Sequence, residues 1–86
     1  MGNFLGGSAY AMSKDIAEGY VLLNASLLKK FTDMELAQLR QQLERVQKEV
    51  RAEQPPQGDV LAIQKRGRKI SRISSAILIL DTLRRR

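Results

Sequence analysis

The amino-acid sequence predicts an all-α protein, a helical hairpin with an additional N-terminal helix that assembles into an oligomeric, coiled-coil-like helix bundle. Two segments with apolar residues at helical spacing, 36–50 and 63–80, flank a short segment that holds both prolines of the chain. An apolar period near 3.6 residues predicts helices, and proline ends them. The β-branched run at 77–80 lies inside a longer helical pattern and leaves a strand there as the lesser alternative.

The chain of 86 residues is long enough for one small domain. Residues 1–11 hold three of the six glycines, and we interpret them as a flexible N-terminal arm. Residues 12–86 are then a single helical domain, with helices over about 13–30, 32–53 and 60–84.

The first helix is predicted over residues 13–30. Ser13 is a suitable N-cap residue, and Gly19 weakens the helix by roughly 1 kcal/mol relative to alanine. The apolar face that defines this helix consists of Ile16, Tyr20, Leu23 and Leu27.

The second helix begins with the sequence Thr32-Asp33-Met34-Glu35, which predicts a capping box between Thr32 and Glu35. Phe31 precedes the cap and Leu36 occupies the fourth helical position, the pattern of a hydrophobic staple. The chain therefore restarts as a helix near residue 32. A true corner and one kinked rod are both compatible with this pattern.

The second helix carries a narrow apolar seam on an otherwise polar rod. Spacings of three and four residues alternate along it, which is the a/d pattern of a coiled coil. The seam consists of Leu36, Leu39, Leu43, Val46 and Val50.

Pro55 and Pro56 end the second helix, and Asp59 can cap a third helix over residues 60–84. A connection this short makes the two helices antiparallel neighbours. Gly67 either lies within a continuous helix, which we favour, or breaks it. Residues 76–83 are apolar nearly all round, so we expect burial of this part from two sides.

A lone hairpin of this size buries little apolar surface. We therefore predict a homodimer or a higher homo-oligomer, in which a second copy covers both apolar seams. The predicted oligomer interface consists of Leu36, Leu39, Leu43, Val46, Val50, Ile70, Ile73, Ile77 and Leu80.

The whole net charge of +6 lies in residues 59–86, which carry eight basic and two acidic side chains. Such asymmetry favours an anionic partner. The candidate anion-binding or nucleic-acid-binding residues are Lys65, Arg66, Arg68, Lys69 and Arg72. The alternative is a solvated face whose cations pair across the hairpin with Glu44, Glu49 and Glu53. A helix-turn-helix centred on Gly67 is a weaker alternative.

Cysteine and histidine are absent, which excludes thiol and imidazole catalysis and most zinc sites. Helix capping or pairing explains most carboxylates. Asp81 interrupts an apolar segment, and it either faces outward, which we favour, or pairs with an arginine. We therefore expect no enzyme, no metal and no cofactor.

The function predicted from these observations is a non-enzymatic cytoplasmic interaction module, an adaptor, scaffold or regulatory subunit that binds an unidentified protein. The alternative is a nucleic-acid-binding regulator that uses the basic face of the third helix. Attachment to an anionic membrane surface ranks last. No apolar run approaches the ~20 residues needed to span a bilayer.

Overall fold

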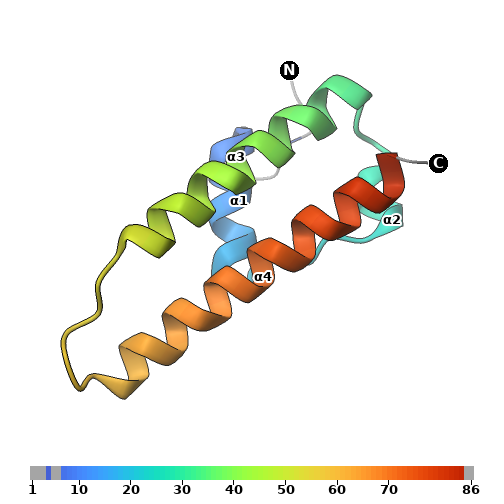
Figure 1. The fold of residues 1–86 in the computed structure, drawn as a ribbon. Helices are drawn as coiled ribbons and strands as arrows, with labels where there is room; N and C mark the ends of the chain where they lie inside the picture. Colours follow the sequence, from blue (N-terminus) through green and yellow to red (C-terminus); the bar gives the residue numbers. More distant parts are fainter. Residues whose placement is uncertain (1–3, 5–6, 85–86) are drawn as a thin grey trace.

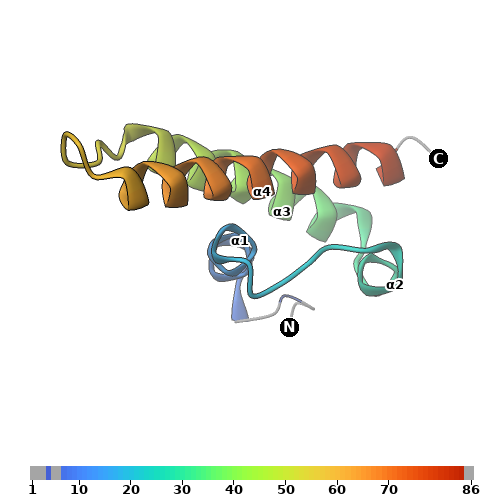
Figure 2. The ribbon, with the colours of Figure 1, turned by 90° about the horizontal axis from the view of Figure 1, so that it is seen from below.

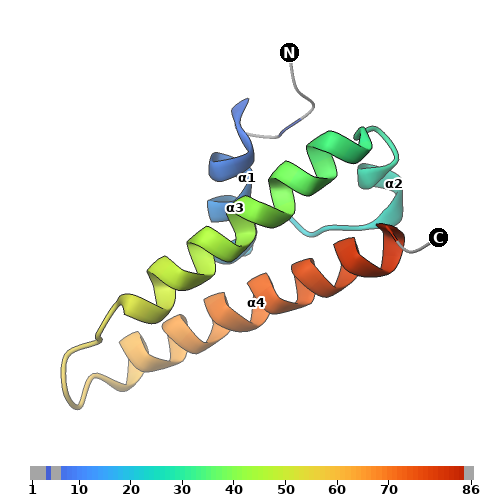
Figure 3. The same ribbon diagram turned by 45° about the horizontal axis from the view of Figure 1, so that its top comes forward.

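The fold is all-helical, as the sequence predicts. The computed structural model describes residue 4 and residues 7–84, and these residues form four helices and no strand (Figure 1). The helices are α1 (Ala9–Glu18), α2 (Ala25–Leu28), α3 (Asp33–Ala52) and α4 (Val60–Arg84). Helices α3 and α4 run side by side as a hairpin, and α1 contacts both of them. Figures 2 and 3 show that α1 and α2 lie on one side of this hairpin and form a second layer.

Helix α1 begins earlier than the sequence predicts, because Ser8 rather than Ser13 is its N-cap. The Ser8 side chain accepts a hydrogen bond from the Ala11 N–H at 3.0 Å. Ser13 is buried inside the helix, where its hydroxyl donates to the Ala9 carbonyl at 2.8 Å. Of the predicted flexible arm, residues 1–3, 5 and 6 lie outside the described residues. Residues 9–11 belong to α1, and the Phe4 ring meets Phe31 edge-on at 5.4 Å.

The predicted helix over 13–30 is wrong, because the chain leaves the helix at Gly19. Gly19 has the left-handed conformation, with φ of 86°. Its N–H donates to the Ile16 carbonyl at 3.1 Å, and the Tyr20 N–H donates to the Asp15 carbonyl at 2.9 Å. These two bonds are the Schellman motif that ends helices at glycine. Residues 21–24 then form a connection without regular structure, and the Asn24 side chain caps the single turn of α2.

Helix α3 starts where the sequence predicts, and Figure 2 shows that α2 and α3 point in different directions, so the chain forms a true corner there. The Thr32 hydroxyl accepts from the Glu35 N–H at 3.1 Å, and the Glu35 carboxylate accepts from the Thr32 N–H at 2.9 Å. The predicted capping box is therefore confirmed.

Helix α4 is continuous through Gly67, as favoured above. Asp59 caps it by accepting from the Ala62 N–H at 3.0 Å. The turn before it closes with the Asp59 N–H donating to the Pro56 carbonyl at 3.0 Å, and Gly58 supplies the positive φ of 83° that the turn requires. The prediction that residues 76–83 are buried from two sides is wrong. Leu78 is 67% exposed, and this segment is buried on one face.

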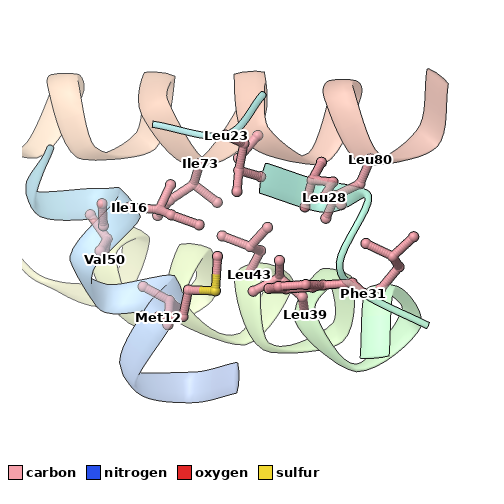
Figure 4. Close-up of a cluster of buried hydrophobic side chains, with 14 residues drawn as sticks. Met12, Ile16, Leu23, Leu28, Phe31, Leu39, Leu43, Val50, Ile73 and Leu80 are labelled. Atoms are coloured by element: carbon pink, nitrogen blue, oxygen red, sulfur yellow. The ribbon is translucent and has the colours of Figure 1, made fainter. Parts of the chain in front are cut away.

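One core lies between the two layers (Figure 4). It draws side chains from α1, from the connection to α2, from α2 itself and from both helices of the hairpin. Met12, Leu39, Leu43, Ile73 and Leu80 are its largest fully buried hydrophobic side chains. Leu23, from the connection between α1 and α2, points into the cluster beside Ile73 (Figure 4).

This core contains the side chains that the sequence assigns to an oligomer interface. All five seam residues of α3 are buried within the single chain, as are Ile73 and Leu80. Ile70 and Ile77 are partly buried and pack against the same cluster. The physical reason is that α1 and α2 cover the hairpin, so the chain itself supplies the layer that the sequence argument assigned to a second copy.

Candidate functional site

The two hairpin helices are joined by an ion pair between Arg40 and Asp81. The Arg40 Nε lies 2.6 Å from Asp81 Oδ1, and its Nη2 lies 3.2 Å from Oδ2. Glu44, one turn along α3, also pairs with Arg40. The hydrogen bond to Asp81 raises the pKa of Arg40 above its ordinary value, although partial desolvation opposes the shift. Asp81 therefore pairs with an arginine, and the favoured prediction of an outward-facing Asp81 is wrong.

Arg66 does not belong to the accessible cations, because its guanidinium caps the end of α3. Its Nε donates to the carbonyls of Val50 at 3.2 Å and Glu53 at 3.0 Å, and its Nη2 donates to that of Arg51 at 2.8 Å. The last carbonyls of a helix lack intrahelical partners and carry partial negative charge. The prediction of Arg66 as an anion-binding residue is therefore not supported by its position.

Arg72 caps the end of α1 in the same way. Its Nη1 donates to the Ala17 carbonyl at 3.0 Å, near the Gly19 turn. One turn before it, the Lys69 ammonium lies 3.0 Å from the Glu18 carboxylate. Lys69 and Arg72 thus pair with the end of α1, and the predicted carboxylate partners Glu44, Glu49 and Glu53 do not fill this role.

Four cations and one carboxylate line a shallow pocket of about 370 Å³ on this face of α4. We call the four, Lys65, Arg68, Lys69 and Arg72, the cationic cluster. Lys65 and Arg68 are exposed and have no hydrogen-bond or ion-pair partner among residues 4 and 7–84. Among the described residues, Glu18 is the one carboxylate that lines the pocket, so the positive charge of this face exceeds the negative charge there.

An apolar groove of about 470 Å³ adjoins the cationic cluster. It lies between α1, the connection that follows it, and α4, and it shares Arg68 and Arg72 with the cationic pocket. Figure 2 shows this connection passing beneath α4. The lining residues are Ile16, Gly19, Val21, Leu22, Leu23, Arg68, Ser71, Arg72, Ser75, Ala76 and Ile79.

Sequence reasoning identifies the cationic cluster but misses the groove. The groove exists because Gly19 ends α1 and turns residues 21–23 toward α4. A left-handed C-terminal cap at this glycine is the signal that could have located it.

A second polar cluster, around Tyr10, connects α1 to α3. The Tyr10 hydroxyl donates to Glu49 Oε1 at 2.8 Å, and the Arg45 guanidinium lies 4.7 Å from the ring centre. The hydrogen bond to Glu49, desolvation and the Glu49 charge raise the pKa of Tyr10, whereas the charge of Arg45 opposes them. These contacts join the start of α1 to the second half of α3.

The described residues contain no group of three or more acidic side chains that could hold a metal ion. Within the same residues, no helix has the length and apolar character needed to cross a membrane. Comparison of the chain with protein-family models, with curated proteins and with solved structures finds no match in any of the three.

Proposed function

We propose that the chain is a non-enzymatic helical interaction module, an adaptor, scaffold or regulatory subunit that binds another protein along one stripe of α4. The observation that supports this proposal is the spacing of Leu61, Lys65, Arg68 and Arg72, which places an exposed apolar side chain and three cations on one helix face. Leu61 is 69% exposed.

This stripe has the composition of a protein-binding surface. Arginine and large apolar residues are enriched where proteins contact one another, and complementary charge accelerates association. Val60, Leu61 and Ile63 are exposed together where α4 leaves the hairpin loop. The partner surface that fits is apolar opposite these residues and acidic opposite the cationic cluster.

Site-specific photo-crosslinking tests this proposal. A photoreactive residue at position 61 of the full chain is expected to capture a discrete partner, and Lys65→Gln with Arg68→Gln is expected to reduce the yield. The matched control is the same residue at Met34, which is 72% exposed on α3. Equal capture from both positions, or capture unaffected by the two charge substitutions, would contradict binding along this stripe.

Self-association, the other part of the predicted function, requires side chains outside the core. We propose that the exposed Val60, Leu61 and Ile63 supply them, since the predicted seam residues are occupied within the chain. Sedimentation equilibrium tests this, with Leu61→Ser expected to weaken association. A chain that stays monomeric at every accessible concentration would contradict self-association without affecting partner binding.

Nucleic-acid binding is the second candidate function, and the unbalanced positive charge of the cationic cluster is the observation that favours it. Phosphate contacts would make affinity fall steeply with salt. A filter-binding series with duplex DNA and with RNA decides between the candidates. Absence of binding at low salt eliminates this one.

A further inference from the structure

We infer that the groove between α1 and α4 binds a small amphipathic anion, an apolar chain that carries a single oxyanion head. This inference goes beyond the proposed protein-binding function and does not depend on it. It rests on the joining of an apolar groove to a cationic pocket through two shared arginines.

The size and lining of the groove are those of a small-molecule site. Its volume of about 470 Å³ lies in the range of ligand pockets, and such pockets combine mostly apolar walls with a few polar groups. Ile16, Val21, Leu22 and Ile79 supply apolar walls here. Leu22 is 83% exposed, so an apolar ligand that covers it removes a large hydrocarbon surface from water.

The head of the ligand would meet Arg68. This side chain lines both pockets and has no hydrogen-bond or ion-pair partner within the described part of the chain. Its guanidinium can form two parallel hydrogen bonds to a carboxylate or a phosphate. Arg72, one turn along α4, uses Nη1 for the Ala17 carbonyl and also lines both pockets.

The arrangement also sets the polarity and length of the ligand. Charged residues occupy the part of the site nearest the start of α4, and Ala76 and Ile79 occupy the other end. From Arg68 to Ala76 the helix rises by about 12 Å. An extended alkyl chain of about ten carbons has a comparable length, and its head would lie at Arg68.

A free amphiphile explains both halves of the site better than a nucleic acid or a membrane does. Nucleic-acid phosphates would use the cations and leave the apolar wall uncovered. A bilayer surface would contact the rim, whereas Ile16 and Leu23 lie at the buried side of the groove. The ligand that uses the whole site is therefore a single chain with an anionic head.

A titration of the full chain with decanoate, followed by two-dimensional amide NMR below the micelle concentration, tests the inference. Saturable shifts are expected for the amides of residues 19–23 and 68–79. Acetate, which lacks the chain, and decyltrimethylammonium, which reverses the charge, are expected to bind at least about tenfold more weakly. Decyl phosphate distinguishes a phosphate head from a carboxylate.

Two pairs of variants locate the site. Arg68→Gln and Leu22→Ser are each expected to weaken decanoate binding by about five- to tenfold. Arg51→Gln and Leu78→Ser make the same chemical changes at exposed positions outside the groove and are expected to leave the dissociation constant unchanged. All four positions are exposed, and thermal unfolding confirms that each variant is folded.

The inference is overturned if decyltrimethylammonium or acetate binds as tightly as decanoate, or if the shifts are unsaturable or lie elsewhere. It is also overturned if Arg68→Gln has no effect. Binding to phosphatidylglycerol vesicles without binding to free decanoate or decyl phosphate assigns the site to a membrane and overturns it as well. None of these outcomes bears on the crosslinking from position 61.

Discussion

Replacing Gly19 by alanine probes the turn on which the whole candidate site depends. Gly19 ends α1 with φ of 86°, a conformation that costs an ordinary L-residue roughly 1–2 kcal/mol. A Cβ atom at this position would lie 3.1 Å from the Arg72 Cζ, closer than an ordinary van der Waals contact. The guanidinium would then have to move, which weakens its hydrogen bond to the Ala17 carbonyl.

Together these effects predict that Gly19→Ala lowers the free energy of unfolding by roughly 2–3 kcal/mol, with about 1 kcal/mol of it from the Arg72 hydrogen bond. For a domain of this size that corresponds to a decrease in Tm of roughly 10–20 °C. Gly67→Ala is the matched control, because Gly67 lies within α4 and its added Cβ would meet nothing within 4 Å. It is expected to stabilise the chain by roughly 0.5–1 kcal/mol through helix propensity.

Thermal unfolding followed by circular dichroism measures both variants against the parent chain. Gly19→Asn adds an intermediate case, since asparagine tolerates the left-handed conformation better than alanine does. A Gly19→Ala variant that melts at or above the temperature of the parent would refute the proposed turn. Changes of the same sign in Gly19→Ala and Gly67→Ala would refute the reasoning equally.

Three further variants test the core, the α1–α3 contact and the helix cap. Leu43→Ala should lower the free energy of unfolding by about 2–5 kcal/mol in chemical denaturation, because the side chain is fully buried. A loss below about 1 kcal/mol would place Leu43 outside the core. The hydrogen bond to Glu49 raises the pKa of Tyr10 above its ordinary value of 10.0. The difference in unfolding free energy between the parent and Tyr10→Phe should therefore persist below pH 10 and disappear as the pH rises through the raised pKa. A difference that grows above pH 10 would contradict this sign. Arg66→Gln should lower the free energy of unfolding by roughly 1–2 kcal/mol in thermal unfolding, whereas Arg68→Gln should stay within about 0.5 kcal/mol of the parent. Equal effects would contradict the different roles of the two arginines.

The parts of the fold that the sequence predicts well are those with strong local signals. The capping box at Thr32 is complete within four residues, and the apolar seam of α3 repeats over two heptads. Asp59 lies directly after the interrupting prolines and caps α4 as expected. In each case the atoms that determine the structure are close together in the chain.

The N-terminal segment could not be predicted in the same way, because two patterns compete there. The apolar period continues from Ile16 to Leu27 and favours one helix, whereas Gly19 and Asn24 each favour a cap. The contacts with α4 decide between them. Arg72, more than fifty residues away, holds the last turn of α1, and no local pattern shows this.

The candidate site is also predictable from the sequence only where its residues are close together in the chain. The helical spacing of Lys65, Arg68, Lys69 and Arg72 is visible in the sequence, and the structure gathers these side chains around one pocket. The groove beside them is formed by residues 16–23 and 68–79, which only the tertiary fold brings together. For the same reason the pairing of Asp81 with Arg40 is not evident from either position in the sequence.

The positions of the cations on α4 also limit how strongly salt can affect binding of any anion. Arg66 and Arg72 face the carboxyl ends of α3 and α1, and Lys69 pairs with Glu18, so Lys65 and Arg68 are the cations of this group without a partner among the described residues. If all five cations bound phosphates of duplex DNA, a plot of log affinity against log salt concentration would have a slope of about −4.5. If two cations bound phosphates, the slope would be about −2. A measured slope near −2 would show that the fold keeps three of the five cations in place during binding. A slope near −4.5 would mean that binding releases both helix caps, and Arg66→Gln would then weaken binding as much as Arg68→Gln does.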